Sequence, residues 1–149
     1  MLRDVDDADL DAIYEQQRDP ESVAMALVPS RERDAFEAHW RRIRADETTA
    51  IRVIEADGEV AGHVLSWEQD GRRLVGYWLG REFWGRGLAT AALAEFVAEL
   101  PRPLHARVAR SNPASRRVLE KCGFVPIEER AEHDERIGRV VDELRYELR

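Results

Sequence analysis

The order of hydrophobic and polar residues divides the first part of the chain into strand-like and helical stretches. A short strand is predicted at residues 2–5. Apolar residues then recur at helical spacing, and a second helical stretch begins near Ser30. The predicted buried faces consist of Leu10, Ile13, Tyr14 and Gln17 in the first helix, and of Phe36, Trp40 and Ile43 in the second.

Residues 49–79 follow a different pattern, with three β-rich runs separated by two Asp-Gly pairs at positions 57–58 and 70–71. Asp-Gly between apolar runs is a strong signal for a tight hairpin turn, because both turn residues need positive backbone φ angles. The sequence therefore predicts an antiparallel meander of three strands in this segment.

The second half of the chain returns to a helical period over Leu88–Leu100, and "PRP" ends that helix. Residues 104–108 alternate like a half-buried strand, and a further helix begins at Pro113 and ends at Gly123. A last pair of strands follows, of which "DELRYELR" is the clearer member. The whole order predicts one mixed α/β domain over residues 1–149, with a central, mostly antiparallel sheet and about four helices.

Composition and charge narrow the class of protein. The chain has a formal net charge of -7, so general affinity for nucleic acid or anionic membrane is not expected. Cys122 is the only cysteine, which excludes a disulfide framework and a CxxC metal clasp. No apolar run reaches the roughly 18 residues of a membrane span, and the first residues, "MLRDVDDADL", are too acidic for a signal peptide. A cytoplasmic protein is expected.

The stretch "FWGRGLAT" lies between the meander and the helix that starts near Leu88. The first amides of a helix lack internal partners, and Gly85 and Gly87 remove the β-carbons that would keep a ligand away from them. This pattern predicts an anion site for a phosphate or pyrophosphate. It is neither a P-loop, which needs a lysine, nor a dinucleotide fingerprint, which needs a third glycine. A tight turn with glycines for packing is the alternative.

Two motifs at this spacing resemble the GNAT (Gcn5-related N-acetyltransferase) superfamily. "YWLGREFWGRGLAT" is similar to its acetyl-CoA motif, and "NPASRRVLEKCGF" to the helix that follows. The details look most like the subgroup that acetylates the N-termini of ribosomal proteins. The resemblance implies one acyl-CoA N-acyltransferase domain with the family's splayed sheet, acetyl-CoA as co-substrate, and no metal.

The resemblance also implies which residues contact the co-substrate. The backbone of Trp78 and Leu79 would pair with the pantetheine arm, Asn112 would contact that arm, and Ser115 would lie near the sulfur. The residues implied around the phosphates are Trp84, Gly85, Arg86, Gly87, Leu88, Ala89 and Thr90. The side chains of Arg86 and Arg116 could also engage CoA phosphates, or could simply be solvated at the surface. From the residues alone, Asn112 could simply cap its helix, and the Ser115 hydroxyl could satisfy backbone groups.

The catalytic residues are less clearly indicated. The tyrosine that serves many members as general acid would fall at Leu119, so Ser115 is the substitute that the resemblance suggests. Glu68 and His63 are the candidate general bases, ahead of Tyr77 and His105. An acceptor α-amine, with a pKa of about 7.7–8.0, can react without a dedicated base, whereas a lysine needs one.

The expected reaction is direct acetyl transfer to a primary amine in a ternary complex, at a split in the sheet beside the strand at residues 104–108. The first two helices and the loop between them, residues 18–32, would form the wall opposite the cofactor. Asp19 and Glu21 in that loop favour a cationic acceptor, a peptide N-terminus ahead of a polyamine or drug. A non-catalytic acyl-CoA-binding module and an interaction scaffold are the alternatives. A homodimer through the C-terminal strands remains open.

Overall fold

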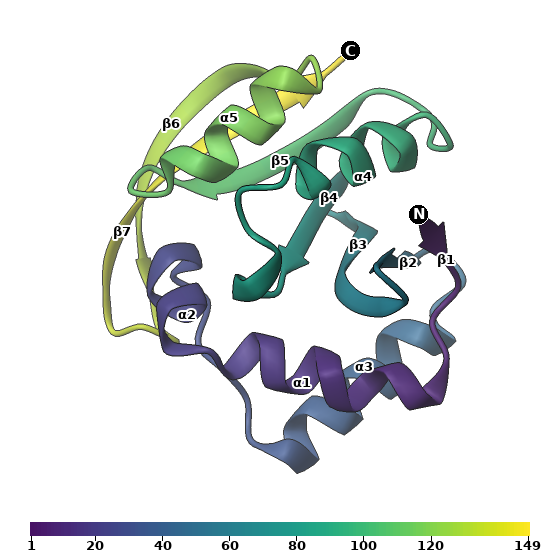
Figure 1. Cartoon of the computed structure of the whole chain (residues 1–149). Helices are drawn as coiled ribbons and strands as arrows, with labels where there is room; N and C mark the ends of the chain where they lie inside the picture. Colours follow the sequence, from purple (N-terminus) through teal and green to yellow (C-terminus); the bar gives the residue numbers. More distant parts are fainter.

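The computed structural model of the protein describes residues 1–149. Seven strands form one sheet, and helices cover both of its faces (Figure 1). The strands are β1 (Leu2–Arg3), β2 (Ala50–Ala56), β3 (Glu59–Gln69), β4 (Arg72–Leu79), β5 (Leu104–Ala109), β6 (Val125–Asp134) and β7 (Arg139–Leu148). The helices are α1 (Leu10–Arg18), α2 (Pro20–Ala26), α3 (Arg33–Ala45), α4 (Leu88–Val97) and α5 (Pro113–Lys121), with short 3-10 turns at Asp7–Asp9 and Arg81–Phe83.

The strand order is β1-β2-β3-β4-β5-β7-β6, and every neighbouring pair is antiparallel except β4 and β5. These two parallel strands are in register only at Leu74 and His105. Beyond that pair, the end of β4 that leads to Leu79 has no partner on its β5 side. The mixed, mostly antiparallel sheet and its split beside β5 are therefore confirmed.

The predicted meander is also confirmed, since β2, β3 and β4 pair in sequence around the two Asp-Gly turns.

Helix α2 was not predicted from the sequence. Asp19 accepts a hydrogen bond from the Ser22 amide, and Pro20 occupies the first turn of α2. A proline and a capping aspartate suit the start of a helix as well as a loop. The structure therefore has five α-helices, where the sequence predicted about four.

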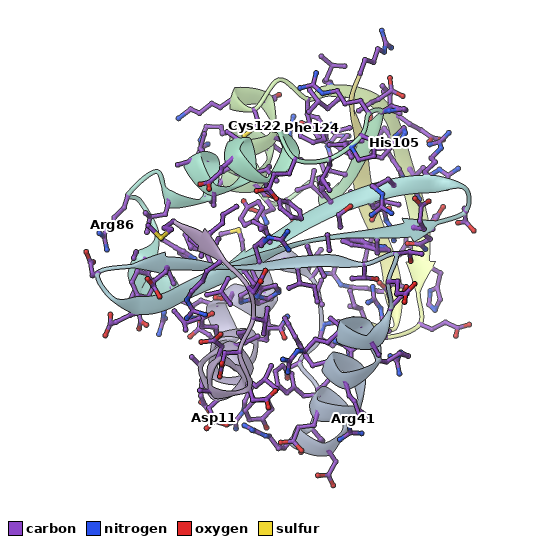
Figure 2. The ribbon with its side chains drawn as sticks, turned by 90° about the vertical axis from the view of Figure 1, so that its right-hand side faces the viewer. Asp11, Arg41, Arg86, His105, Cys122 and Phe124 are labelled. Carbon is purple, nitrogen blue, oxygen red and sulfur yellow. The ribbon has the colours of Figure 1, made fainter.

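The two faces of the sheet pack against different helices. Helices α4 and α5 cover one face, and α1 and α3 cover the other (Figures 1 and 2). On the α4–α5 face, Leu93, Phe96 and Tyr146 are fully buried, and on the α1–α3 face Ile13, Phe36 and Trp40 are buried. None of the helices has the length and apolar character needed to cross a membrane.

His63 belongs to the core under α3. Its ring meets Trp40 edge-on, with ring centroids 5.0 Å apart and an interplanar angle of 82°. Burial, with a smaller contribution from the nearby His39, lowers the pKa of His63 from 6.5 to about 4. The imidazole is therefore neutral in the folded protein at pH 7.

We expect the free energy of unfolding to fall as the pH decreases from 6.5 to about 4, because only the unfolded chain protonates His63 in that window. The stabilisation is complete above pH 6.5, and its loss approaches about 3 kcal/mol below pH 4. Urea unfolding of the wild type and His63→Gln at several pH values measures the difference. His133→Gln, at an exposed site on β6, should follow the wild type. Equal acid sensitivity of the wild type and His63→Gln would contradict the expectation.

Candidate functional site

The glycines of "FWGRGLAT" adopt a backbone conformation that other residues rarely take. Gly85 has a φ of +77° and Gly87 a φ of +75°, and a β-carbon added at either position would meet no atom within 4 Å. Packing within the protein therefore does not require these glycines. The left-handed conformation requires them, and the space in front of the loop is open.

The backbone amides of this loop have no carbonyl partners. None of the amides from Gly85 to Thr90 donates to a backbone carbonyl, and the first bond within α4 runs from the Ala91 amide to the Gly87 carbonyl at 3.1 Å. No side chain caps the helix either. A run of free donors at the positive end of a helix is suited to binding an anion, and the anion site at these residues stays a prediction.

Side chains around the loop hold it in place. Phe83 is buried beneath it, and the indole of Trp84 donates to the Leu79 carbonyl at 3.0 Å. Arg86 lies at the end of the sheet (Figure 2), where its guanidinium is 2.8 Å from the Asp57 carboxylate. Arg86 thus ties the loop to the β2–β3 turn, and its predicted contact with phosphate stays a prediction.

Near the split, the backbone amide and carbonyl groups of successive β4 residues point alternately toward β3 and toward the split. The Gly80 amide donates to the Ala61 carbonyl of β3 at 2.8 Å. Successive residues of a strand turn their hydrogen-bonding groups to opposite edges, so Tyr77 and Leu79 turn theirs toward the split and Trp78 turns its own toward β3. The indole of Trp78 donates to the Gln16 carbonyl at 3.0 Å. The roles predicted for Trp78 and Leu79 stay predictions.

Helix α5 brings two hydroxyl groups together across the split. Asn112 caps the helix through its side-chain oxygen, which accepts from the Ser115 amide at 3.2 Å. The Ser115 side chain lies close to Tyr77 of β4. Burial raises the pKa of Tyr77, and the nearby Ser115 hydroxyl offsets part of that rise. Tyr77 therefore remains a protonated phenol at neutral pH.

Arg116 of α5 and Cys122, which follows the helix directly, contribute to the surroundings of the site. The Cys122 thiol donates to the Thr90 carbonyl across a sulfur–oxygen distance of 3.5 Å, and burial raises its pKa, which keeps it a thiol (Figure 2). Arg116 reaches the Tyr146 hydroxyl at 3.5 Å. Leu119, at the position where the resemblance would place a tyrosine, is buried in the core. The Cys122 contact links α5 to the start of α4 beside the glycine loop.

The candidate bases lie elsewhere. His63 is buried on the α1–α3 face, away from Ser115 and Tyr77. Glu68 is ion-paired with Arg73 at 3.0 Å, about 20 Å along β3 from the residue opposite Leu79. The structure therefore does not bring Ser115, Glu68 and His63 together, and their catalytic roles stay predictions. His105 is buried beside Glu147, with 3.8 Å between the imidazole nitrogen and the carboxylate.

Sequence reasoning ranked Tyr77 low because it considered the residue only as a base. The alternation of residues along β4 could have indicated a role for Tyr77, because it puts this side chain on the same face as Val75 and Leu79, under α4 and α5.

No cluster of three or more His, Cys, Asp or Glu side chains that could hold a metal ion occurs in the chain.

Comparison with known proteins gives a family. Residues 1–125 match the model of the Acetyltransferase (GNAT) domain. Over 101 residues the chain is 30% identical to YdaF of Bacillus subtilis (strain 168), whose name proposes a ribosomal N-acetyltransferase. That alignment covers 62% of this chain and 55% of the relative, so it spans only about half of YdaF.

Solved structures agree on the fold. The spermidine N-acetyltransferase of Vibrio cholerae, in complex with CoA and spermine, superimposes with a TM-score of 0.84 at 21% identity, over 99% of this chain and 94% of that one. The ribosomal-protein-alanine N-acetyltransferase of Brucella melitensis gives a TM-score of 0.83 at 20% identity, over 99% and 98% of the two chains. The chain therefore belongs to the GNAT acetyltransferase family and resembles its ribosomal N-acetyltransferase members, as the two motifs predict.

Proposed function

We propose that this protein transfers the acetyl group of acetyl-CoA to a primary amine by direct attack within a ternary complex. The observation that carries the proposal is the run of free amides from Gly85 to Thr90, beside the unpartnered edge of β4. The loop supplies donors for a pyrophosphate, and the split supplies a channel for an extended arm. The CoA complex of the V. cholerae relative supports the same co-substrate.

The split also supplies groups for the chemistry. The neutral amine would attack the thioester carbonyl carbon, the carbon–sulfur bond would break, and the amine would lose a proton to solvent. The leaving thiolate needs a hydrogen bond or a proton, since a free thiol has a pKa of about 8.5. Ser115 would donate a hydrogen bond to the sulfur, and Tyr77, which its raised pKa keeps protonated, would donate in turn to Ser115 until solvent protonates the thiolate.

A dedicated base is not essential to this reaction. An acceptor α-amine, with a pKa of about 7.7–8.0, is partly neutral near pH 7.5. A water molecule can then accept the proton that is released. The burial of His63 and the ion pair of Glu68 are compatible with this route. The proposed acceptor is therefore an amine that reacts without strong activation, either a peptide N-terminus or a small molecule.

The glycine loop gives the first test. We expect acetyl-CoA to raise the melting temperature of the wild type by several degrees and to bind Gly87→Glu at least about tenfold more weakly, because a carboxylate would occupy the anion site. Calorimetric titration gives the two dissociation constants.

Gly71→Glu is the matched control. Gly71 has a φ of +76° and equally open space, but it lies in the β3–β4 turn, so this variant should bind acetyl-CoA like the wild type. Equal binding by Gly87→Glu, or no binding by the wild type at millimolar concentration, would refute the proposed site. Binding without CoA release, whatever amine is offered, would instead identify a non-catalytic acyl-CoA-binding module.

The hydroxyl pair gives the second test. We expect Tyr77→Phe to lower kcat by about ten- to a hundredfold and to leave the acetyl-CoA dissociation constant within about threefold, because only hydrogen-bond donation toward the leaving thiolate is lost. Ser115→Ala should have a similar effect, and the double variant should add little, since the two groups act in one chain. Stopped-flow detection of CoA release measures each rate. A Tyr77→Phe enzyme with the wild-type kcat would remove Tyr77 from the mechanism.

A further inference from the structure

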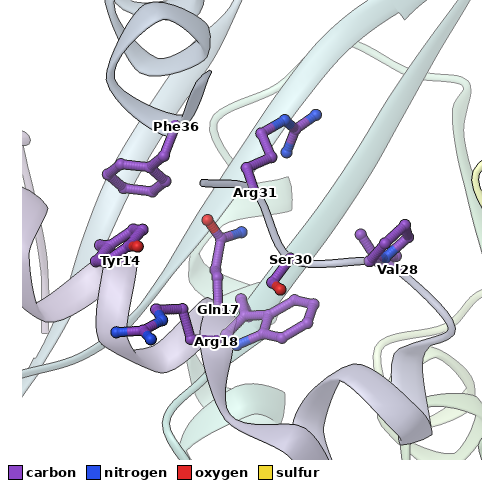
Figure 3. Close-up of a pocket in the computed structure, with 9 residues that line it drawn as sticks. Tyr14, Gln17, Arg18, Val28, Ser30, Arg31 and Phe36 are labelled. Atoms are coloured by element: carbon purple, nitrogen blue, oxygen red, sulfur yellow. The ribbon is translucent and has the colours of Figure 1, made fainter. Parts of the chain in front are cut away.

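A hollow of about 480 Å³ opens to solvent at the end of the sheet, beside the turn that follows β4. Helix α1, the first residues of β3 and residues 80–83 enclose it. Its volume falls within the roughly 300–1,000 Å³ that is typical of small-molecule sites. A second recess on α1, between Tyr14 and Trp78, has a volume of only about 10 Å³, which is room for about one water molecule (Figure 3). Of these two, only the larger hollow can hold an organic ligand.

The rim of this hollow is acidic. Arg81 is the only cationic side chain that lines it, and it is surrounded by four carboxylates, those of Glu15, Asp19, Glu59 and Glu82. The Arg81 guanidinium is already engaged, at 3.2 Å from Asp19 and 3.0 Å from Glu21. Glu15 is paired with Arg18 at 3.2 Å, but Glu59 and Glu82 are exposed and have no ion-pair partner. The hollow therefore carries an excess of negative charge, which a cationic ligand would offset.

Gln16 brings a buried acceptor to the same hollow. The residue is only 9% exposed, and its side-chain nitrogen donates to the Val60 carbonyl at 2.8 Å. Its oxygen Oε1 is buried and accepts no hydrogen bond. Gly80 packs against this amide, since a β-carbon added there would lie 3.1 Å from the amide nitrogen. The amide is thus held in the orientation that leaves Oε1 without a donor. Buried acceptors are commonly completed by a ligand or by water, so Gln16 is a second, independent sign of a ligand with donors.

The lining also selects among cations. Ala12, Val60 and Phe83 give the hollow an apolar part, against which an alkyl chain can lie while its charged ends stay near the carboxylates. An ammonium group has three donors and no acceptor, so it suits both the carboxylates and the oxygen of Gln16. A metal ion does not suit the hollow, because its carboxylates are spread around the rim and no three of them gather closely enough to hold one. The phosphates of acetyl-CoA would be repelled by the same charges.

We infer that this hollow binds an organic cation in which an alkyl chain joins two or more ammonium groups, a diamine or a polyamine. The site goes beyond the proposed acetyl transfer and does not depend on it. The hollow adjoins α1, whereas Tyr77 faces α4 and α5 from a position three residues before Gly80, about 10 Å earlier along β4. The hollow is therefore separate from the place where Tyr77 and Ser115 approach each other.

Calorimetric titration of the protein without acetyl-CoA tests the site independently of any acetyl transfer. The probes are 1,5-diaminopentane, spermidine and pentylamine, which has the same carbon chain as the diamine and one ammonium group fewer. We expect the diamine and spermidine to bind with dissociation constants below about 1 mM, and pentylamine to bind at least about tenfold more weakly, because one ammonium group reaches fewer of the carboxylates. Magnesium chloride at matched ionic strength should not displace the diamine, since the hollow does not gather ligands for a metal ion.

The test variant combines Glu59→Gln with Glu82→Gln. Both side chains are exposed and without ion pairs, so the change removes charge from the rim and leaves the core intact. Binding of the diamine should weaken at least about tenfold. The matched control combines Glu47→Gln with Glu95→Gln, which are also exposed and unpaired but lie outside the hollow. The control has the same net charge as the test variant and should bind the diamine within about twofold of the wild type. Thermal melting without ligand checks that both variants are folded.

Nuclear magnetic resonance locates the bound diamine. The signals of the Gln16 side-chain amide and of the Gly80 backbone amide should shift on titration, and those of Gly87 in the glycine loop should not. Shifts at Tyr77 and Ser115 instead would place the diamine in the split and overturn the separate site. The inference is also wrong if the diamine does not bind at about 10 mM, if it binds no better than pentylamine, or if the test and control variants bind it equally.

Discussion

The single parallel register pair between Leu74 and His105 is the constraint on which the rest of the site depends. It joins the β2–β3–β4 meander to the β5–β7–β6 half of the sheet, and Val75, Leu104 and Tyr146 pack beside it in one buried cluster. Because β4 and β5 separate after this pair, the last residues of β4 keep backbone groups without a strand partner. Free backbone groups are costly when buried, so an edge like this persists where water or a ligand can satisfy it.

The glycine loop continues this edge of β4 toward the start of α4, and its backbone amides also lack hydrogen-bond partners. Trp84 satisfies the Leu79 carbonyl, but the amides that follow remain free. What holds them in this arrangement is the core beneath. Phe83, Ala89, Ala92 and Phe96 are all buried in one cluster, and the Cys122 thiol bonds the Thr90 carbonyl from α5. Stability is thus supplied by apolar packing on the inner side of α4, while the outer side of its first turn is kept open.

Local signals in the sequence were enough to predict the order of most strands and helices and the position of the glycine loop. The Asp-Gly pairs gave the meander, with positive φ at Asp57 and Asp70, and Asn112 and Pro113 gave the start of α5. Contacts between distant segments were beyond such signals. The approach of Ser115 to Tyr77 depends on how strands and helices pack, and periodicity reports which face a residue occupies but not what it meets there. Glu68 was placed near the site because the length of β3, which runs from Glu59 to Gln69, was not read from the sequence.

The positions of the candidate bases bear on which amine can react. His63 is buried against Trp40 under α3, and Glu68 is ion-paired with Arg73, so neither faces Ser115 and Tyr77. A lysine side chain, with a pKa of about 10.4, is almost wholly protonated at pH 7 and would need an activation that neither residue supplies. An α-amine, with a pKa of about 7.7–8.0, is partly neutral without such help. Under the proposed function, the absence of these two residues from the site therefore favours acceptors of low pKa over lysine side chains.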